Sequence, residues 1–491
     1  MGRGIAQMAA QAGSHVFLFD LQPGSADAAR QALADTWQKL VDKSKLDAGQ
    51  RDQMLERLSC VATMAELSPC HLVVEAVVER LDIKQKLFVE LETLLAKNAV
   101  LATNTSSLSV TSIGAALKRP GRLAGFHFFN PVPLMRVVEV IAGLKTDPVV
   151  CAQLTAFARQ FGHTPVSAQD TPGFIVNHAG RGYGTEALRV ASERVADFAT
   201  IDRILRDQMG FRLGPFELMD LTALDVSHPV MESIYRQYYD EPRYRPSVIT
   251  AQRLAGGVVG KKVGDGFYAY KEGVAQVPAE PPVPELASLP PVWVSPKAAR
   301  RAELYQLLKN LGASIETTQA PSDSALILVA PLGLDVTTLA AVERLDPTRT
   351  VGIDMMLEDA ATKRRVLATN PATRPDMRDA AHALFAKDGK AVSVIKDSGG
   401  FVTQRVVATI VNIAADMCQQ GICSPKDLEV AVTLGLGYPL GPLAMGDRVG
   451  PTNVLEILFN MGTVYGDPRY RPSPWLRRRG ALGLSLMHEE A

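Results

Sequence analysis

Four polar residues have side chains that could take a proton from an alcohol and hold the substrate in place. His127 can accept a proton near neutral pH, because imidazole titrates in that range. Glu139 follows in an apolar stretch, and a buried carboxylate beside an imidazole fixes its tautomer and stabilises its protonated form. Ser106 and Asn177 can hydrogen-bond an alcohol or a carbonyl oxygen. The set suits the oxidation of a secondary alcohol with His127 as general base.

Each of these residues also has a purely structural interpretation. A histidine among aromatic residues, such as His127, often belongs to a core, and Glu139 could be a charge at the end of a strand. Ser106 could cap a helix, and Asn177 could cap a helix or bind backbone. The residue types alone leave both interpretations open.

Strands and helices alternate around the four residues. Apolar runs at 72–77, 100–103 and 123–128 have the length of buried strands, and 82–95 has the spacing of an amphipathic helix. The predicted apolar side of this helix comprises Ile83, Leu87, Leu91, Leu94 and Leu95. Such alternation predicts a parallel, doubly wound α/β sheet. Ligands of these sheets bind at the carboxyl ends of the strands, and Ser106 follows one of them.

The beginning of the chain has the pattern of half a dinucleotide-binding unit. A small, glycine-opened helix at 2–12 precedes an apolar strand at 15–20 that ends in Asp20. In a Rossmann-type unit the helix N-terminus faces the pyrophosphate and the acid binds the adenosine ribose. Gly2 would be the third glycine of GxGxxG, and the first strand and the first two glycines are missing from this chain. The pattern also fits an ordinary helix, turn and strand.

Two expectations follow from the dinucleotide interpretation. The native polypeptide would begin roughly ten or more residues upstream, which is the length of a strand and a glycine turn. The cofactor would be NAD and not NADP, because the negative charge of Asp20 would repel a 2′-phosphate.

Three motifs recur later in the chain at nearly constant distance. The pairs are 170–174 with 397–401, 213–220 with 440–447, and 242–247 with 468–473. The first two pairs lie 227 positions apart, and the third, Pro-Arg-Tyr-Arg-Pro-Ser in both copies, lies 226 apart. The chain therefore contains two copies of one helical domain. The same distance aligns 125–127 with 352–354, which predicts a degenerate α/β segment in the second copy.

The pattern divides the chain into five regions. Residues 273–296 hold seven prolines, which is typical of a linker. The predicted regions are a Rossmann-like NAD-binding domain at 1–169, a helical domain at 170–272, the linker at 273–296, a degenerate Rossmann-like segment at 297–395 and a second all-α domain at 396–491.

The composition is that of a globular protein, with 47% hydrophobic and 21% charged residues. Lys and Arg together number 52, as do Asp and Glu, so the charge balance favours neither a nucleic-acid nor an anionic membrane partner. Five scattered cysteines show no metal spacing, and we expect reduced thiols in the cytoplasm and neither metal nor disulfide. The sequence contains no apolar run of membrane-spanning length and no signal-peptide pattern.

The first 270 residues resemble the 3-hydroxyacyl-CoA dehydrogenase family. The motifs that carry the resemblance occur in order at 104–107, 125–131, 170–177 and 264–268. The resemblance implies NAD-dependent oxidation of an acyl-CoA substrate, with His127 as base, Glu139 as its partner, and Ser106 and Asn177 as substrate-orienting groups. It further implies NAD contacts from Gly2, Asp20, Ala76, Glu79, Lys84, Asn104 and Ser107. The two-copy layout is similar to the longer bacterial form of the family, which includes enzymes of phenylacetate breakdown.

The repeat provides an internal comparison. The positions that correspond to Ser106, His127, Glu139 and Asn177 are Gly333, Asp354, Val366 and Gln404, so none of the four side chains is retained. We therefore expect a catalytically silent second copy that takes the place of a partner subunit in an intrachain pseudo-dimer. A homodimer is the other possibility. The sequence departs from the family at Gly180, Gly182 and Gly184, where the family has a continuous helix.

Two rival functions remain open at this point. A dehydrogenase of a free 3-hydroxy acid would share the layout and the proton-accepting set. A non-catalytic or weakly active scaffold would account for the truncated dinucleotide motif, although it would not account for the complete set of four polar residues.

Overall fold

The computed structural model describes residues 1–359 and 361–490 and divides the chain into two compact units. The first comprises Met1–His178 with Gly421–Leu436, and the second Ala179–Gln420 with Gly437–Ala491. Segment 421–436 thus belongs to a different unit from the rest of the helical domain predicted at 396–491. Among the described residues, no helix combines the length and apolar character that a membrane span requires.

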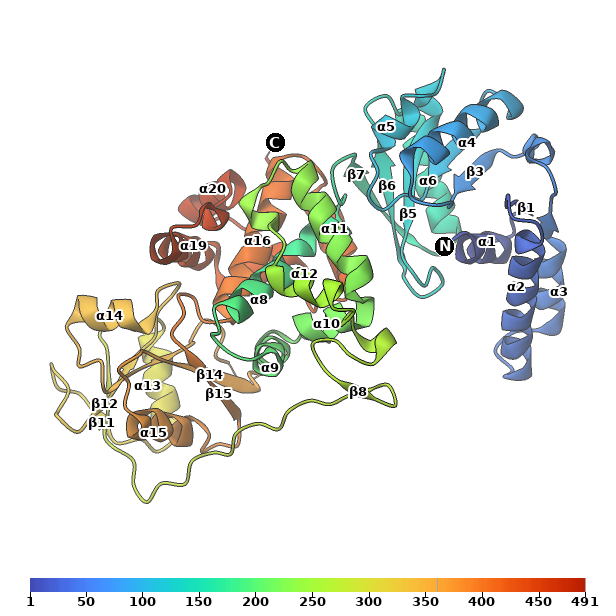
Figure 1. Ribbon diagram of the computed structural model, residues 1–491. Helices are drawn as coiled ribbons and strands as arrows, with labels where there is room; N and C mark the ends of the chain where they lie inside the picture. The colour runs from blue at the N-terminus through green and yellow to red at the C-terminus, as the bar shows by residue number, and fades with distance from the viewer. Residues whose placement is uncertain (360, 491) are drawn as a thin grey trace. The chain divides into compact units, whose positions relative to one another are not determined.

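The first unit is built on a five-stranded sheet in the order β3-β4-β5-β6-β7 (Figure 1). The strands are Leu72–Glu75, Val100–Thr103, Leu123–Phe128, Val137–Ala142 and Thr164–Gln169. The strands predicted at 72–77, 100–103 and 123–128 are parallel as expected, and β6, which was not among them, runs antiparallel to β5. The connection at 129–136 explains the reversal, since a parallel crossover needs a dozen or more residues.

The strand that precedes Asp20 lies outside this sheet. β1 (Val16–Leu18) pairs in parallel with β2 (Leu58–Cys60) in a separate two-stranded sheet (Figure 1). In the described part of the chain no strand pairs with both β1 and β3. The sequence predicted this interruption of the Rossmann-type fold. Helices α1 (Gly2–Gln11), α2 (Ser25–Asp42) and α3 (Ala48–Glu56) complete the region. Ile5 and Ala9 of α1 join the core of the five-stranded sheet.

The helix predicted at 82–95 is α4 (Leu81–Leu94), but its buried side differs from the predicted one. Its deeply buried residues are Lys84, Phe88, Leu91 and Glu92, whereas Ile83, Leu87 and Leu94 are half-buried. Relative to the prediction, the buried side of the helix is turned toward Lys84, which has a carboxylate partner, Glu75, inside the protein. The remaining helices before the helical region are α5 (Val110–Gly114), α6 (Pro148–Gln160) and α7 (Val176–Ala179).

The second unit holds most of both helical copies. Its helices are α8 (Arg181–Ser192), α9 (Phe198–Met209), α10 (Pro215–Thr222), α11 (Leu224–Gln237), α12 (Val248–Ala255), α16 (Thr403–Gln419), α18 (Pro442–Val449), α19 (Pro451–Tyr465) and α20 (Pro474–Leu482). Helices α8 and α16, which are related by the repeat, pack against each other (Figure 1). A Cβ on Gly182 would lie 3.1 Å from the Cα of Ile410, so this glycine allows the close approach of the two backbones.

We expect Gly182→Ala and Gly184→Ala to have opposite effects on stability. An added methyl group at 182 meets rigid backbone and should destabilise the protein by about 1–3 kcal/mol. At 184 the nearest atom is the mobile Cε of Met219, and alanine gains up to about 1 kcal/mol of helix propensity. Urea unfolding of both variants measures the difference. Equal effects of the two substitutions would show that close packing does not explain Gly182.

The second α/β segment forms its own sheet, in the order β11-β10-β12-β13-β14-β15. The strands, in chain order, are β10 (Val292–Val294), β11 (Ile315–Glu316), β12 (Leu326–Val329), β13 (Thr350–Ile353), β14 (Arg364–Thr369) and β15 (Ala391–Lys396). Helices α13 (Arg301–Asn310), α14 (Val336–Glu343) and α15 (Pro375–Phe385) accompany them. The predicted linker at 273–296 is too long at both ends. It begins inside the hairpin of β8 (Tyr270–Lys271) and β9 (Val274–Ala275), and β10 is a buried strand.

Each copy contributes one helix to the sheet of the other copy. In the first unit α17 (Pro425–Leu436) packs against β6 and β7, and the Gln169 amide donates to the Ile422 carbonyl over 2.9 Å. In the second unit α9 packs against β14, and the Lys396 amide donates to the Val195 carbonyl over 3.0 Å. Both hydrogen bonds connect positions that the repeat relates, so the exchange of helices is reciprocal.

Candidate active site

His127 and Glu139 face each other across the antiparallel pair β5 and β6. They are directly opposed in the strand register, and Nδ1 of His127 lies 2.6 Å from Oε2 of Glu139. The His127 residue is 5% exposed and Glu139 is 0% exposed. Because Nδ1 faces the carboxylate, Nε2 is the ring nitrogen that remains for a substrate proton.

A tight turn supplies two further hydrogen bonds to Glu139. Gly173 and Phe174 have φ values of 79° and 48°, which turns the chain so that the amides of Ile175 and Val176 both reach Oε1 over 2.9 Å. These amides stabilise the charged carboxylate. Phe174 itself lies 5.9 Å from the His127 ring, centroid to centroid, and Phe129 lies 4.4 Å away.

Ser106 and Ser107 gather around Glu79. Oε1 of Glu79 accepts hydrogen bonds from the Ser106 amide at 2.9 Å and from the Ser107 hydroxyl at 3.0 Å. Burial raises the pKa of Glu79, but the Thr105 hydroxyl, the Lys84 charge and these donors outweigh it and hold the pKa below its ordinary value. Ser106 does not cap the following helix; the hydroxyl of Ser109 does.

Glu75 is a charged residue of this region that the sequence reasoning missed. Its Oε1 lies 2.6 Å from Nζ of Lys84, and its Oε2 accepts the Thr103 hydroxyl at 2.7 Å. Lys84 also reaches Oε2 of Glu79 over 3.3 Å. The sequence signal that could have identified Glu75 is its place as the acid that ends the strand Leu72–Glu75. The network fixes Lys84 between the ends of β3 and β4.

The two asparagines lie on different elements of the same unit. Oδ1 of Asn104 accepts the amide of Phe128 at 2.8 Å, which ties the end of β4 to the residue after His127. Asn177 lies in α7, next to the amide of Val176 that binds Glu139. The structure thus joins His127 with Glu139 and Ser106 with Glu79, while the catalytic and binding roles of these residues stay predictions.

Three of the residues predicted to bind a dinucleotide, Gly2, Ala76 and Asp20, lie at or just beyond the ends of α1, β3 and β1. A Cβ on Gly2 would be 3.7 Å from the Cβ of Ala76, so the start of α1 lies against the end of β3. The side chain of Met1 makes no capping hydrogen bond to the first amides of α1. Asp20 is exposed after β1. Their contacts with the pyrophosphate and the ribose of a dinucleotide stay predictions.

In the second copy, three of the four corresponding residues form one buried cluster. Nε2 of Gln404 donates to Oδ1 of Asp354 over 2.9 Å, and the Gly333 amide donates to Oε1 of Gln404 over 2.8 Å. Burial raises the pKa of Asp354. The Gln404 amide occupies the space between these groups, and Val366 offers no charge, so the acid–base pair is absent from this copy.

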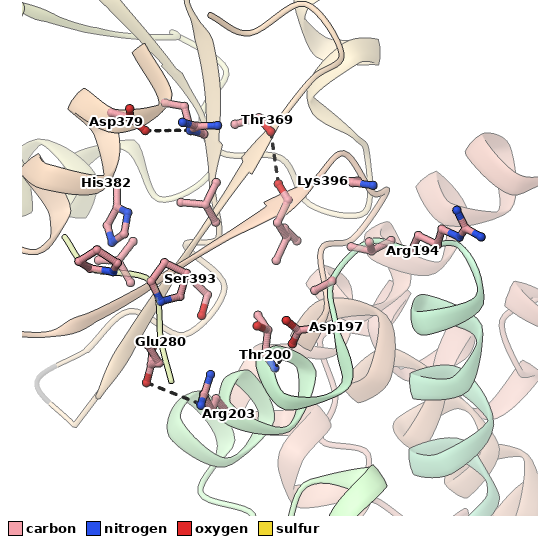
Figure 2. Close-up of a pocket in the computed structure, with 18 of the residues that line it drawn as sticks. Arg194, Asp197, Thr200, Arg203, Glu280, Thr369, Asp379, His382, Ser393 and Lys396 are labelled. Carbon is pink, nitrogen blue, oxygen red and sulfur yellow. Dashed lines mark hydrogen bonds and ion pairs between the residues drawn. The ribbon is translucent and has the colours of Figure 1, made fainter. Parts of the chain in front are cut away.

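A cavity of about 830 Å³ lies in the second unit (Figure 2). Strand β15, the beginning of α9, α15 and the proline-rich segment 281–284 line it. Arg203 is paired there with Glu280, and Arg378 with Asp379. None of His127, Glu139, Ser106 and Asn177 belongs to its walls, so it is separate from the candidate active site.

The first unit thus combines a Rossmann-type sheet, an architecture typical of nucleotide-binding dehydrogenases, with a buried His–Glu pair. Three family profiles match the chain. The NAD-binding domain of 3-hydroxyacyl-CoA dehydrogenase matches residues 1–171, and the C-terminal domain of that enzyme matches 173–270 and 400–485. The reduced Rossmann-fold domain of 3-hydroxybutyryl-CoA dehydrogenase matches 332–398.

Relatives and solved structures agree with these matches. The 3-hydroxyadipyl-CoA dehydrogenase of Escherichia coli K12 is 35% identical over 98% of this chain and 96% of that protein. Human mitochondrial hydroxyacyl-coenzyme A dehydrogenase is 39% identical over 55% of this chain and 88% of that protein. The crystal structure of an Escherichia coli 3-hydroxybutyryl-CoA dehydrogenase superimposes with a TM-score of 0.84 at 34% identity, over 98% of this chain and 96% of that one.

The chain belongs to the 3-hydroxyacyl-CoA dehydrogenase family. It is therefore an oxidoreductase that uses NAD and acts on acyl-CoA substrates.

Proposed function

We propose that His127 is the general base in the oxidation of a 3-hydroxyacyl-CoA to the 3-oxoacyl-CoA, with Glu139 as its partner; His127 takes the hydroxyl proton, and the hydride goes to NAD. The observation that carries the proposal is the 2.6 Å contact between Nδ1 of His127 and Oε2 of Glu139 inside the core. The contact leaves Nε2 to take the hydroxyl proton of the substrate. The carboxylate stabilises the imidazolium that results.

The surroundings of Glu139 keep it ready for this role. Two backbone amides donate hydrogen bonds to its other oxygen, which offsets part of the cost of burying a carboxylate. Ser106 and Asn177 would orient the alcohol and the thioester carbonyl of the substrate. Ser106 would have to share or exchange its contact with Glu79 to do so.

NAD supplies the hydride acceptor when it is bound. The residues that would hold it are Gly2, Asp20, Ala76, Glu79, Lys84, Asn104 and Ser107. The ion pairs of Lys84 with buried Glu75 and with partly exposed Glu79 support this side of the site, because they fix one charged side chain against two carboxylates.

We propose 3-hydroxyadipyl-CoA and 3-hydroxybutyryl-CoA as substrates, in phenylacetate or fatty-acid catabolism in the cytoplasm. Relatives that carry these substrate names support the choice. The packing of α8 on α16 supports an intrachain pseudo-dimer in place of a homodimer.

The test is NADH formation, followed by absorbance, with both thioesters and with free 3-hydroxybutyrate. We expect turnover of at least one thioester and none of the free acid. Comparable turnover of the free acid would favour a 3-hydroxy-acid dehydrogenase. Absence of turnover, together with absent NAD binding, would favour the non-catalytic scaffold.

A further inference from the structure

Helix α17 belongs to the second copy in sequence and to the first unit in structure. Its buried residues Leu428, Ala431 and Val432 lie on one side of the helix, and the helix packs against β6 and β7. Strand β6 carries Glu139. A helix of the silent copy therefore lies against the strand that holds half of the proposed acid–base pair.

Gly435, near the end of α17, lies very close to two residues of the first copy, Val176 and Val137. A Cβ built on this glycine would lie 2.9 and 3.1 Å from the two Cγ atoms of Val176 and 3.4 Å from Cγ1 of Val137. The first distance is shorter than real carbon contacts. Val176 is 2% exposed and Val137 is 0% exposed, and the β-branched side chain of Val176 has little freedom to turn away. Any side chain at 435 must therefore displace Val176.

Both neighbours of Gly435 are connected to Glu139. The Val176 amide donates to Oε1 of Glu139 over 2.9 Å, and Val137 precedes Glu139 by two residues on the same strand, with its side chain on the same face. The other oxygen of Glu139 is held to His127 by the register of β5 and β6. Displacement of Val176 would thus weaken the hydrogen bond from the Val176 amide to Glu139, while the contact between Glu139 and His127 stays in place.

We propose that Gly435 is a positioning residue for the His127–Glu139 pair. The second copy would then have a role in the reaction although its own acid–base set is lost: it supplies the helix that keeps the Val176 amide on Glu139. This inference rests on the proposed function of His127 as general base.

The test is Gly435→Ala in the full-length protein, which adds one carbon atom and also favours the helix. A displacement of this kind should lower kcat by about tenfold. The pH profile of kcat/KM should move as well. With one amide donor weakened, the Glu139 carboxylate attracts a positive charge on the imidazole more strongly. We therefore expect the acidic limb of the variant's profile to lie at higher pH than that of the wild type.

Among the described contacts, those of the His127 ring are with one charged group and two aromatic rings. Glu139 faces it from β6, while Phe129 and Phe174 present uncharged rings from the loop after β5 and from the turn before α7. Loss of folded protein alone would lower kcat without moving the pH profile.

Two further variants complete the design. Gly462→Ala places the same methyl group on α19 in open space and should leave kcat and the pH profile unchanged. Gly435→Ala combined with Val176→Ala removes the two clashing carbons and should recover most of the lost kcat. A Gly435→Ala protein with wild-type kinetics, an unshifted or downward-shifted profile, or no recovery in the double variant would overturn the inference. Retained activity of His127→Gln would instead overturn the proposed function.

Discussion

Replacement of His127 by glutamine should lower kcat by roughly 10²–10⁴, the contribution of a general base. Glutamine can still donate a hydrogen bond to Glu139, but its amide cannot accept a proton from the substrate. The strand register that opposes positions 127 and 139 stays intact, so the fold should be unchanged. Steady-state kinetics with 3-hydroxybutyryl-CoA and NAD, together with circular dichroism, provide the measurement.

The exposed histidine at position 71 offers a matched control, since His71→Gln makes the same substitution on the surface. This variant should keep wild-type kcat. A second check uses the partner. If His127 and Glu139 act as one unit, the double variant His127→Gln, Glu139→Gln should be little slower than His127→Gln alone. Wild-type kcat in His127→Gln, or fully additive losses, would contradict the assignment.

Arg405→Met should destabilise the protein by about 3–5 kcal/mol, because it leaves a buried carboxylate with less compensation. The side chains of Arg405 and Glu186 are both 0% exposed, and Nη2 lies 2.8 Å from Oε1. Glu186 belongs to α8 and Arg405 to α16, so the pair connects the two copies. Chemical unfolding measured at neutral pH gives the change in free energy.

The matched control for this prediction is Arg374→Met, which removes an arginine from an exposed ion pair with Asp376. Exposed pairs of this kind contribute about 0–1 kcal/mol. If the two variants lost similar stability, or Arg405→Met lost less than about 1 kcal/mol, the buried pair would not be a main connection between the copies.

The pH dependence of this difference has a definite sign. Burial raises the pKa of Glu186, but the charges of Arg405 and Arg469 outweigh it and hold the pKa below its ordinary value. In the wild type the carboxylate therefore stabilises the fold at neutral pH, and this contribution is lost only as the pH falls through the lowered pKa. Without Arg405 burial dominates and the carboxyl can take a proton earlier. The deficit of Arg405→Met should be largest near pH 7 and smaller near pH 5.

Local pattern predicted several elements of the fold. The strand at 100–103, the interruption before β3 and the repeat at 227 positions all follow from composition and order along the chain. Strand direction and the buried side of a helix could not be predicted in the same way. Apolar length does not tell whether β6 runs parallel to β5, and the spacing of α4 does not reveal that Lys84 turns inward to meet Glu75.

The candidate site shows the same division. The types of His127 and Glu139 and their places in apolar runs made them candidates, and the register of two strands brings them together. The amides that bind Glu139 could not be predicted, since they depend on left-handed geometry at Gly173 and Phe174. Nor could Gly435, because its importance lies in a contact across hundreds of residues and leaves no local trace in the sequence.

The reciprocal exchange of α9 and α17 constrains how this chain can change over evolutionary time. A copy that has lost its chemistry would ordinarily be free to shrink or to be deleted. Here each copy supplies a helix that packs on the sheet of the other copy, so neither copy is a separable module. Deletion of the second copy would remove a covering helix from the strand that holds Glu139. The fold can therefore tolerate replacement of the reactive side chains in one copy far better than removal of that copy.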